Sequence, residues 1–286
     1  TKAIKNKTIM ENELDLICHC IEHMAKKESA QYILTQLGVS YKRSDTLKAL
    51  ATKVRREYGS NKEICINKIC KLYRDNWLQQ NTEDMTNLHI SNLQSNKLKG
   101  HNWHKTSPSM LHRGMQDRVR ECSAGEINLD KLIEIGADIM RQEYYIVATH
   151  DIIESSIIRK IDTVIPPIGG TKSITDFVIG GYPMDLKVSH YTGEFISKAG
   201  NMTKEDKMLF AKTLYDGADS ERQRKQAEKA LHNWGLNRLY VLVKDTEEWF
   251  SNPMSIVTRV LDQLRDPDIL SVKIEEGYTS VIVVEA

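Results

Sequence analysis

The sequence predicts an α/β protein in which a mixed β-sheet is flanked by helices and preceded by a helical region. Two apolar runs joined by Gly180-Gly181 predict a β-hairpin, because primed two-residue turns need positive φ angles. Residues 237–245 (NRLYVLVKD) read as a buried strand between helical patterns. Residues 269–286 (ILSVKIEEGYTSVIVVEA) read as a closing hairpin. Strand patterns that alternate with helical patterns are typical of such a fold.

The first part of the chain predicts helices. Residues 28–38 end in a glycine cap, residues 44–59 run from a serine N-cap to Gly59, and residues 61–80 are amphipathic. The string LGVS between the first two helices allows a helix-turn-helix. The loop YKRSD that follows it is long for that motif, so a plain helical bundle is the favoured alternative.

Residues 81–126 change character, being polar, weakly periodic and rich in Asn, Ser, His, Lys and Arg. We expect loops and short helices at the surface there. Four side chains of this segment are of the kinds that hold phosphates or read base edges: Lys105, Arg113, Gln116 and Arg118. Trp103 would stack on a base; the alternative is a polar linker with a buried tryptophan.

The α/β pattern begins near residue 128, so we divide the chain into a helical, basic region (1–126) and an α/β core (127–286). Four further segments of the core read as helices: residues 128–161, 204–218, 220–235 and 252–266. A hairpin, a buried strand and a closing hairpin separated by helices give a mixed sheet with helices around it.

Composition limits the class of protein. The chain has 286 residues, of which 40% are apolar and 28% charged, as is ordinary for a soluble globular protein. No apolar run is long enough to span a membrane, and the first residues do not resemble a secretory signal. The cysteine count is odd, at five, which fits a reducing compartment. We therefore expect a cytoplasmic protein.

The charge is unevenly distributed. The net charge is only +1, but residues 1–110 hold 18 lysines and arginines against 11 aspartates and glutamates. A basic first part beside an acidic remainder fits a protein that holds phosphates with one part and a metal with the other. The alternative is chance clustering of charged side chains on solvated helix faces, which would give the same uneven charge.

The hairpin 175–190 (TDFVIGGYPMDLKVSH) carries the chemistry. If the turn is centred on Gly180-Gly181, Asp176 lies across from Asp185, and Lys187 points to the same face. Like charges directly opposite one another destabilise a sheet, so folding alone would not select them. Two such carboxylates suit a hard cation such as magnesium, and a lysine beside it can orient a water or stabilise charge on a phosphate. One alternative is a surface hairpin in which Lys187 bridges the two exposed aspartates. Another is a structural calcium site, which would give Lys187 no role.

The pattern D-x8-D-x-K on a β-hairpin, with a helix before it and an α/β pattern after it, resembles the PD-(D/E)XK nuclease superfamily, most of all its type II restriction endonucleases. Asp176 and Asp185 match the two acids and Lys187 matches the lysine; Thr175 stands where the proline often does. Many members carry a further glutamate on the preceding helix, for which Glu154 is the candidate and Asp151 the competitor. The resemblance covers about residues 130–286, and residues 1–126 match no family.

The resemblance implies a site-specific endonuclease that hydrolyses phosphodiester bonds of double-stranded DNA with Mg2+, leaving 5′-phosphate and 3′-hydroxyl ends. Asp176, Asp185, Glu154 and the carbonyl of Leu186 would hold the metal, and Lys187 would act on the attacking water. The enzyme would be a homodimer, because a two-fold axis matches a palindrome. DNA contacts are expected from the segment 100–120, the basic helical N-terminus, Ser189 and His190. The alternatives are a nuclease of repair or recombination and a non-catalytic DNA-binding protein.

Overall fold

The computed structural model describes residues 18, 21–22, 27–58, 62–95, 108–167, 176–189, 191, 193–215, 237–274 and 277–286. Its helices are α2 (Lys27–Gln36), α3 (Leu47–Tyr58), α4 (Lys62–Gln80), α5 (Glu83–Gln94), α6 (Pro108–Ser123), α7 (Leu129–Lys160), the 3-10 helix η3 (Gly193–Lys198), α8 (Lys204–Tyr215), α10 (Thr246–Ser251) and α11 (Pro253–Leu264). Its strands are β1 (Phe177–Ile179), β2 (Tyr182–Ser189), β3 (Arg238–Leu242), β4 (Leu270–Ile274) and β5 (Gly277–Glu285).

The strands form one five-stranded mixed sheet in the order β1-β2-β3-β5-β4. The two hairpins at its edges, β1–β2 and β4–β5, are antiparallel, whereas β2, β3 and β5 run parallel in its centre. Parallel neighbours need a crossover, and helices supply it between β2 and β3 and between β3 and β5. The predicted mixed sheet flanked by helices is confirmed.

The β1–β2 hairpin has the predicted register. Ile179 pairs with Tyr182, and Phe177 pairs with Met184. Gly180 and Gly181 have φ angles of 58° and 81°, as a primed turn requires. Because side chains alternate along a strand, Met184 and Leu186 point into the core, where both are buried. Asp185 and Lys187 therefore share the opposite face.

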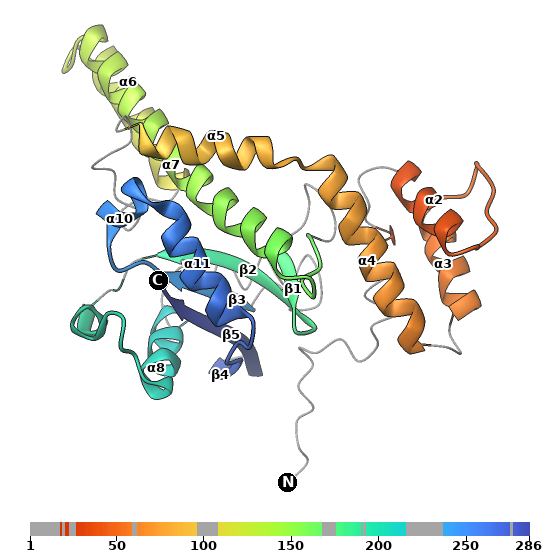
Figure 1. Cartoon of the computed structure of the whole chain (residues 1–286). Helices are drawn as coiled ribbons and strands as arrows, with labels where there is room; N and C mark the ends of the chain where they lie inside the picture. The colour runs from red at the N-terminus through yellow and green to blue at the C-terminus, as the bar shows by residue number, and fades with distance from the viewer. Residues whose placement is uncertain are drawn as a thin grey trace.

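Each face of the sheet packs against its own layer. On one face, α7, α10 and α11 enclose the larger core with residues such as Ile157, Trp249 and Leu239. On the other face, α8 and η3 cover the centre and the β4 edge of the sheet with Phe210 and Phe195. Figure 1 shows α7 and α11 lying across the sheet and α8 beneath it.

Residues 129–160 form a single helix of 32 residues, α7, about 48 Å long. Its N-cap is Asn128, whose side chain accepts a hydrogen bond from the Lys131 amide (2.8 Å). The second half packs on the sheet, and the first half packs against α6 and projects from the body of the molecule (Figure 1). One continuous element thus connects the projecting arm with the sheet.

The helices before α7 divide between two cores. Residues of α2 and α3, among them Ile33, Leu50 and Val54, form a separate apolar cluster against which part of α4 packs. In contrast, Leu93 of α5 belongs to the larger core beside the sheet. The side chain of Arg74 on α4 donates to the carbonyls of Ile158 (3.1 Å) and Arg159 (2.9 Å), which are left without helical partners at the end of α7. These contacts join the helical region to the core.

The segment 81–126 contains more regular structure than its sequence predicts. In place of loops and short helices it forms α5, of 12 residues, and α6, of 16 residues. Both helices pack along α7, so tertiary contacts stabilise a pattern whose own periodicity is weak. The predicted strand start at 171–175 and helix at 220–235 lie outside the described residues. In the part of the chain that is described, no helix is both long and apolar enough to cross a membrane.

Candidate metal centre and active site

Asp176 lies directly before β1, where the hairpin ladder ends. Its backbone N–H donates to the carbonyl of Met184 (2.8 Å), and its Oδ2 accepts from the N–H of Leu186 (2.5 Å). The paired positions stop at Phe177 and Met184, one step short of Asp176 and Asp185. The hydrogen bond from Leu186 turns the Asp176 carboxylate toward the backbone of β2.

Helix α7 brings two further groups to Asp176. His150 and Glu154 lie four residues apart, so they share a helix face. The Nδ1 atom of His150 lies 3.4 Å from Glu154 Oε2, and its Nε2 lies 3.4 Å from Asp176 Oδ2. One donor atom from each of the three residues lies within 4.8 Å of the others, which is a spacing that could hold a metal ion.

The electrostatics of this set follow from burial and mutual contact. Burial raises the pKa of Glu154 to about 7. Burial by itself lowers the pKa of His150, but hydrogen bonds to Asp151 and Asp176 outweigh it and raise the pKa to about 10. For Asp176, burial raises the pKa, and contact with His150 outweighs burial, so that the pKa falls below its usual value. Without a metal, the site at neutral pH therefore holds an imidazolium between carboxyl groups.

Asp185 and Lys187 lie next to this set, on β2. Lys187 Nζ is 2.7 Å from Asp185 Oδ2. Arg238 stands beside Asp185 in the register of the parallel strands β2 and β3, and its Nε lies 3.1 Å from the same oxygen. The Arg238 side chain is 4% exposed and the Asp185 side chain 16%. Burial raises the pKa of Asp185 despite both cations.

The two groups of residues form one site. Asp185 raises the pKa of Glu154 by charge repulsion, and Lys187 lowers the pKa of Asp176 by attraction. Asp185 itself lies outside the compact set of three possible ligands, held by its own cations. The site thus has one part built from α7 and the start of β1, and a second built from β2 and β3.

The residues present fit a divalent cation. Carboxylate oxygens are the ligands that Mg2+ prefers, and Glu154 and Asp176 supply them from two elements. His150 adds an imidazole, which ligates a metal only when it is neutral. Asp185, the fourth group, carries a carboxylate on the neighbouring strand.

The structure places the predicted catalytic residues together. Glu154, Asp176, Asp185 and Lys187 lie in the site, with Leu186 contributing its N–H. The competitor Asp151 is 3.7 Å from His150 Nδ1, and its other oxygen is 3.6 Å from Nε2 of the buried His89. The two candidates for the third acid, Glu154 and Asp151, thus both contact His150.

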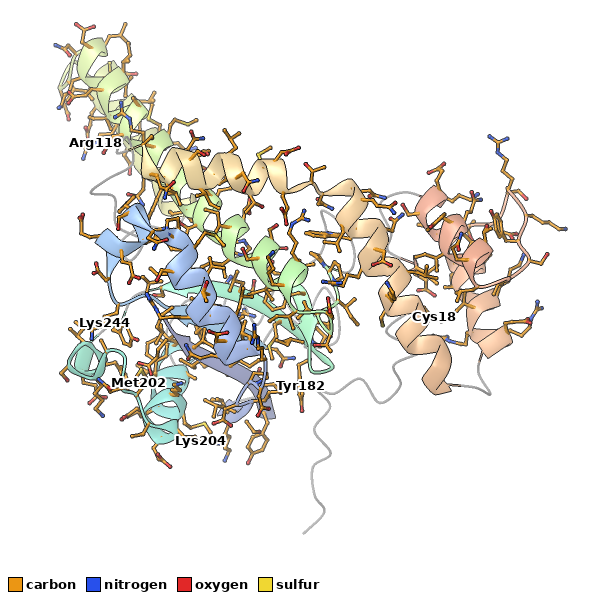
Figure 2. All side chains as sticks on the ribbon, in the orientation of Figure 1. Cys18, Arg118, Tyr182, Met202, Lys204 and Lys244 are labelled. Atoms are coloured by element: carbon orange, nitrogen blue, oxygen red, sulfur yellow. The ribbon has the colours of Figure 1, made fainter. Side chains whose placement is uncertain are left out.

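The predicted DNA contacts have mixed outcomes. Ser189 ends β2, in the same strand as Lys187. Gln116 and Arg118 lie on α6, where Arg118 pairs with Glu121 (2.6 Å), and Figure 2 shows Arg118 well apart from the hairpin residue Tyr182. Lys105, His190 and the side chain of Arg113 lie outside the described residues.

Sequence reasoning missed two residues of the site. His150 had a signal, because it precedes Glu154 by four residues in a predicted helix. Arg238 had no such signal, because the residues of a buried strand do not indicate which other strand will pair with it. Comparisons of the chain with protein-family models, with curated proteins and with solved structures find no match.

Proposed function

We propose that this protein is a metal-dependent nuclease that hydrolyses phosphodiester bonds of double-stranded DNA, with Mg2+ as cofactor. The observation that supports this most is the convergence of two carboxyl groups, from α7 and from the start of β1, on a hairpin that carries Asp185 and Lys187. Folding would not select this arrangement, because it places three half-buried acids close together.

The reaction that fits is attack of water on phosphorus. An O–P bond forms, the bond from phosphorus to the 3′ oxygen breaks, and the two protons of the water pass to a base and to the leaving oxygen. The products carry a 5′-phosphate and a 3′-hydroxyl. A bound divalent cation supplies Lewis-acid polarisation of the phosphate and a lowered pKa of water.

The protein's own groups have distinct tasks in this proposal. Glu154 and Asp176 would hold the cation, and Asp185 and the carbonyl of Leu186 would supply further oxygen donors. Lys187 carries positive charge beside Asp185, where it orients the attacking water or stabilises the charge that develops on the phosphate. Arg238 is too deeply buried to contact DNA and keeps Asp185 in place.

We further propose that cleavage is site-specific and that the enzyme acts as a homodimer, as in the type II restriction endonucleases that the hairpin pattern resembles. A palindromic site and a two-fold axis go together. The exposed apolar residues of the projecting arm, Leu129, Ile133 and Met140, are each more than 60% exposed, which supports a contact between copies there.

A cleavage assay tests the proposal. The protein is incubated with phage-sized duplex DNA in magnesium and separately in EDTA, and the products are run on a gel. We expect discrete bands in magnesium alone. A magnesium-dependent smear would keep the nuclease and reject site-specificity, and intact DNA on unmethylated, methylated and branched substrates would reject the nuclease.

Variants assign the activity to the site. Asp185→Asn and Lys187→Ala should each abolish cleavage and leave DNA binding intact. The matched control is Lys204→Ala, which breaks an exposed pair with Asp268 of the same 2.7 Å length on other elements. Full cleavage by either site variant would contradict the assignment.

A further inference from the structure

The helix α3 separates its residues into an apolar face and a basic face. Leu50, Ala51 and Val54 are buried in the N-terminal cluster. The opposite side carries exposed Lys48, Thr52, Arg55 and Arg56. Thr52 lies four residues after Lys48, and Arg55 and Arg56 lie three and four residues after Thr52, so the four positions form one continuous stripe along the helix.

The loop before α3 adds to this stripe. Lys42 and Arg43 are both exposed there. Asp45 shapes the loop, because its Oδ2 accepts hydrogen bonds from the N–H of Lys42 (2.7 Å) and from Lys53 Nζ (2.5 Å). Lys27 of α2 donates to the carbonyl of Arg43 (2.6 Å), which ties the loop to the neighbouring helix. The two basic side chains are therefore presented from a loop that is held on both sides.

The start of α3 is exposed and carries hydroxyl groups. Thr46 caps the helix, its Oγ1 accepting from the N–H of Ala49 (3.2 Å). Ser44 and Thr46 are exposed beside this end. Hydroxyl groups and a helix N-terminus next to basic side chains are the groups that bind phosphates of a duplex.

The sign of the charge indicates the class of partner. Residues 42–56 contain the six basic residues Lys42, Arg43, Lys48, Lys53, Arg55 and Arg56, and a single acid, Asp45. Asp45 pairs with Lys53, and Glu57 follows Arg56 near the end of α3, so basic side chains outnumber acidic ones on this exposed surface. Placing like charges on one side of a small helical unit opposes folding, and it gives a surface complementary to a polyanion.

We propose that this surface, formed by residues 42–48 and the exposed side of α3 (Thr52, Arg55 and Arg56), binds double-stranded DNA. The N-terminal helical unit would thus hold the duplex separately from the metal centre. The inference goes beyond the proposed cleavage and does not require it, because binding is measured without a metal.

The link between α2 and α3 argues against a tight helix-turn-helix. It spans residues 37–46 and contains the buried Leu37 and Val39. Such a link is longer than the short turn of that motif. The surface resembles a recognition helix only in exposing a basic stripe, so we expect contacts to phosphates to dominate and base contacts to be few.

The test uses the full-length protein, a fluorescent 30-base-pair duplex and EDTA, with binding followed by anisotropy at several salt concentrations. The double variant Lys48→Ala, Arg56→Ala should bind roughly tenfold more weakly or worse, with a salt slope smaller by about two. The charge-matched control is Arg265→Ala, Lys273→Ala, which removes one exposed arginine and one exposed lysine at the far side of the sheet. It should bind as the wild type does.

A second variant separates charge from folding. Lys48→Arg, Arg56→Lys keeps both charges and should restore binding, and thermal melts of all variants check that the N-terminal cluster is intact. Unchanged affinity in the alanine variant, or equal loss in the control, would overturn the proposal. So would tighter binding of single-stranded RNA, single-stranded DNA or heparin than of the duplex.

The outcome is distinguishable from that of the proposed nuclease. Wild-type protein that binds the duplex in EDTA through these residues and cuts nothing in magnesium would keep this inference and reject the nuclease. The opposite result is an alanine variant that cleaves as the wild type does at high and low salt and binds the duplex with unchanged anisotropy. That result would keep the nuclease and reject this inference.

Discussion

At the scale of single residues, the buried pair of Arg238 and Asp185 is the contact whose loss should cost most. Removing one partner of a buried pair leaves an uncompensated charge. We expect Arg238→Ala to lower the free energy of unfolding by about 3–5 kcal/mol in urea denaturation at pH 7.

Arg259 provides the comparison for Arg238. Its pair with Glu248 is of similar length, at 2.7 Å, but the side chains are 41% and 30% exposed. Arg259→Ala should cost about 1 kcal/mol or less, because exposed pairs are screened by solvent. Equal losses in the two variants would show that burial does not govern the Asp185 pair.

His150 gives the site a dependence on pH. Its pKa is raised to about 10 in the folded protein, above the usual 6.5, so folding favours the protonated ring. The stability that this ring contributes is complete below pH 6.5 and is lost as the pH rises toward 10. Glu154 acts in the same sense but at lower pH, because its pKa is raised from 4.5 to about 7, so the stability linked to its protonated form is lost between pH 4.5 and about pH 7.

The His150 effect is therefore measured above pH 7. In EDTA, the difference in unfolding free energy between the wild type and His150→Gln should shrink between pH 7 and pH 10. A difference that stays constant over this range would mean that the ring is not held as a cation. Tyr191→Phe, which removes a buried hydroxyl that donates to Glu285 away from the site, serves as the reference for effects of the pH itself.

At the scale of elements, the turn of the β1–β2 hairpin holds Asp185 and Lys187 in register with β1. Gly181 has a φ of 81°, and a Cβ built there meets no atom within 4 Å. Gly181→Ala should therefore destabilise the protein through backbone strain alone, by about 1–2 kcal/mol.

Gly114 in α6 is the matched control for the hairpin glycine. A Cβ there also meets nothing within 4 Å, and the backbone is helical. Gly114→Ala should stabilise the protein by about 0.5–1 kcal/mol. Thermal melts of the two variants should thus move in opposite directions, and a shift of the same sign in both would contradict the turn geometry.

At the scale of the whole molecule, the exposed side of the α6–α7 arm bears on assembly. Ile133 and Met140 lie seven residues apart on α7, so they occupy the same side of the helix. A two-fold contact uses the same patch of both copies, so one substitution acts on both sides of the interface. A carboxylate introduced there would be buried without a partner in each copy. Ile133→Asp, Met140→Asp should convert a dimer into a monomer in light scattering.

The control for assembly is Met85→Asp, Leu88→Asp on α5. These side chains are 58% and 52% exposed, so the variant adds the same charges to a comparable surface on another helix. It should leave the mass unchanged. A wild-type protein that is monomeric at all concentrations, without and with DNA, would reject the homodimer.

Local signals in the sequence determined the hairpin and its chemistry. Two adjacent glycines set the turn, and the two-residue period of a strand then put Asp185 and Lys187 on one side and Met184 and Leu186 on the other. The mixed sheet followed from the strand and helix patterns in the same way. These features need only residues close to one another in the chain.

Tertiary structure alone decided which distant residues complete the site. Arg238 lies beside Asp185 because β3 returns parallel to β2 after a crossover, and His150 meets Asp176 because α7 packs across that edge of the sheet. Helices α5 and α6 likewise form from weakly periodic sequence because α7 offers them a surface. Contacts between residues so far apart in sequence depend on packing and crossover geometry, which no local pattern of side chains encodes.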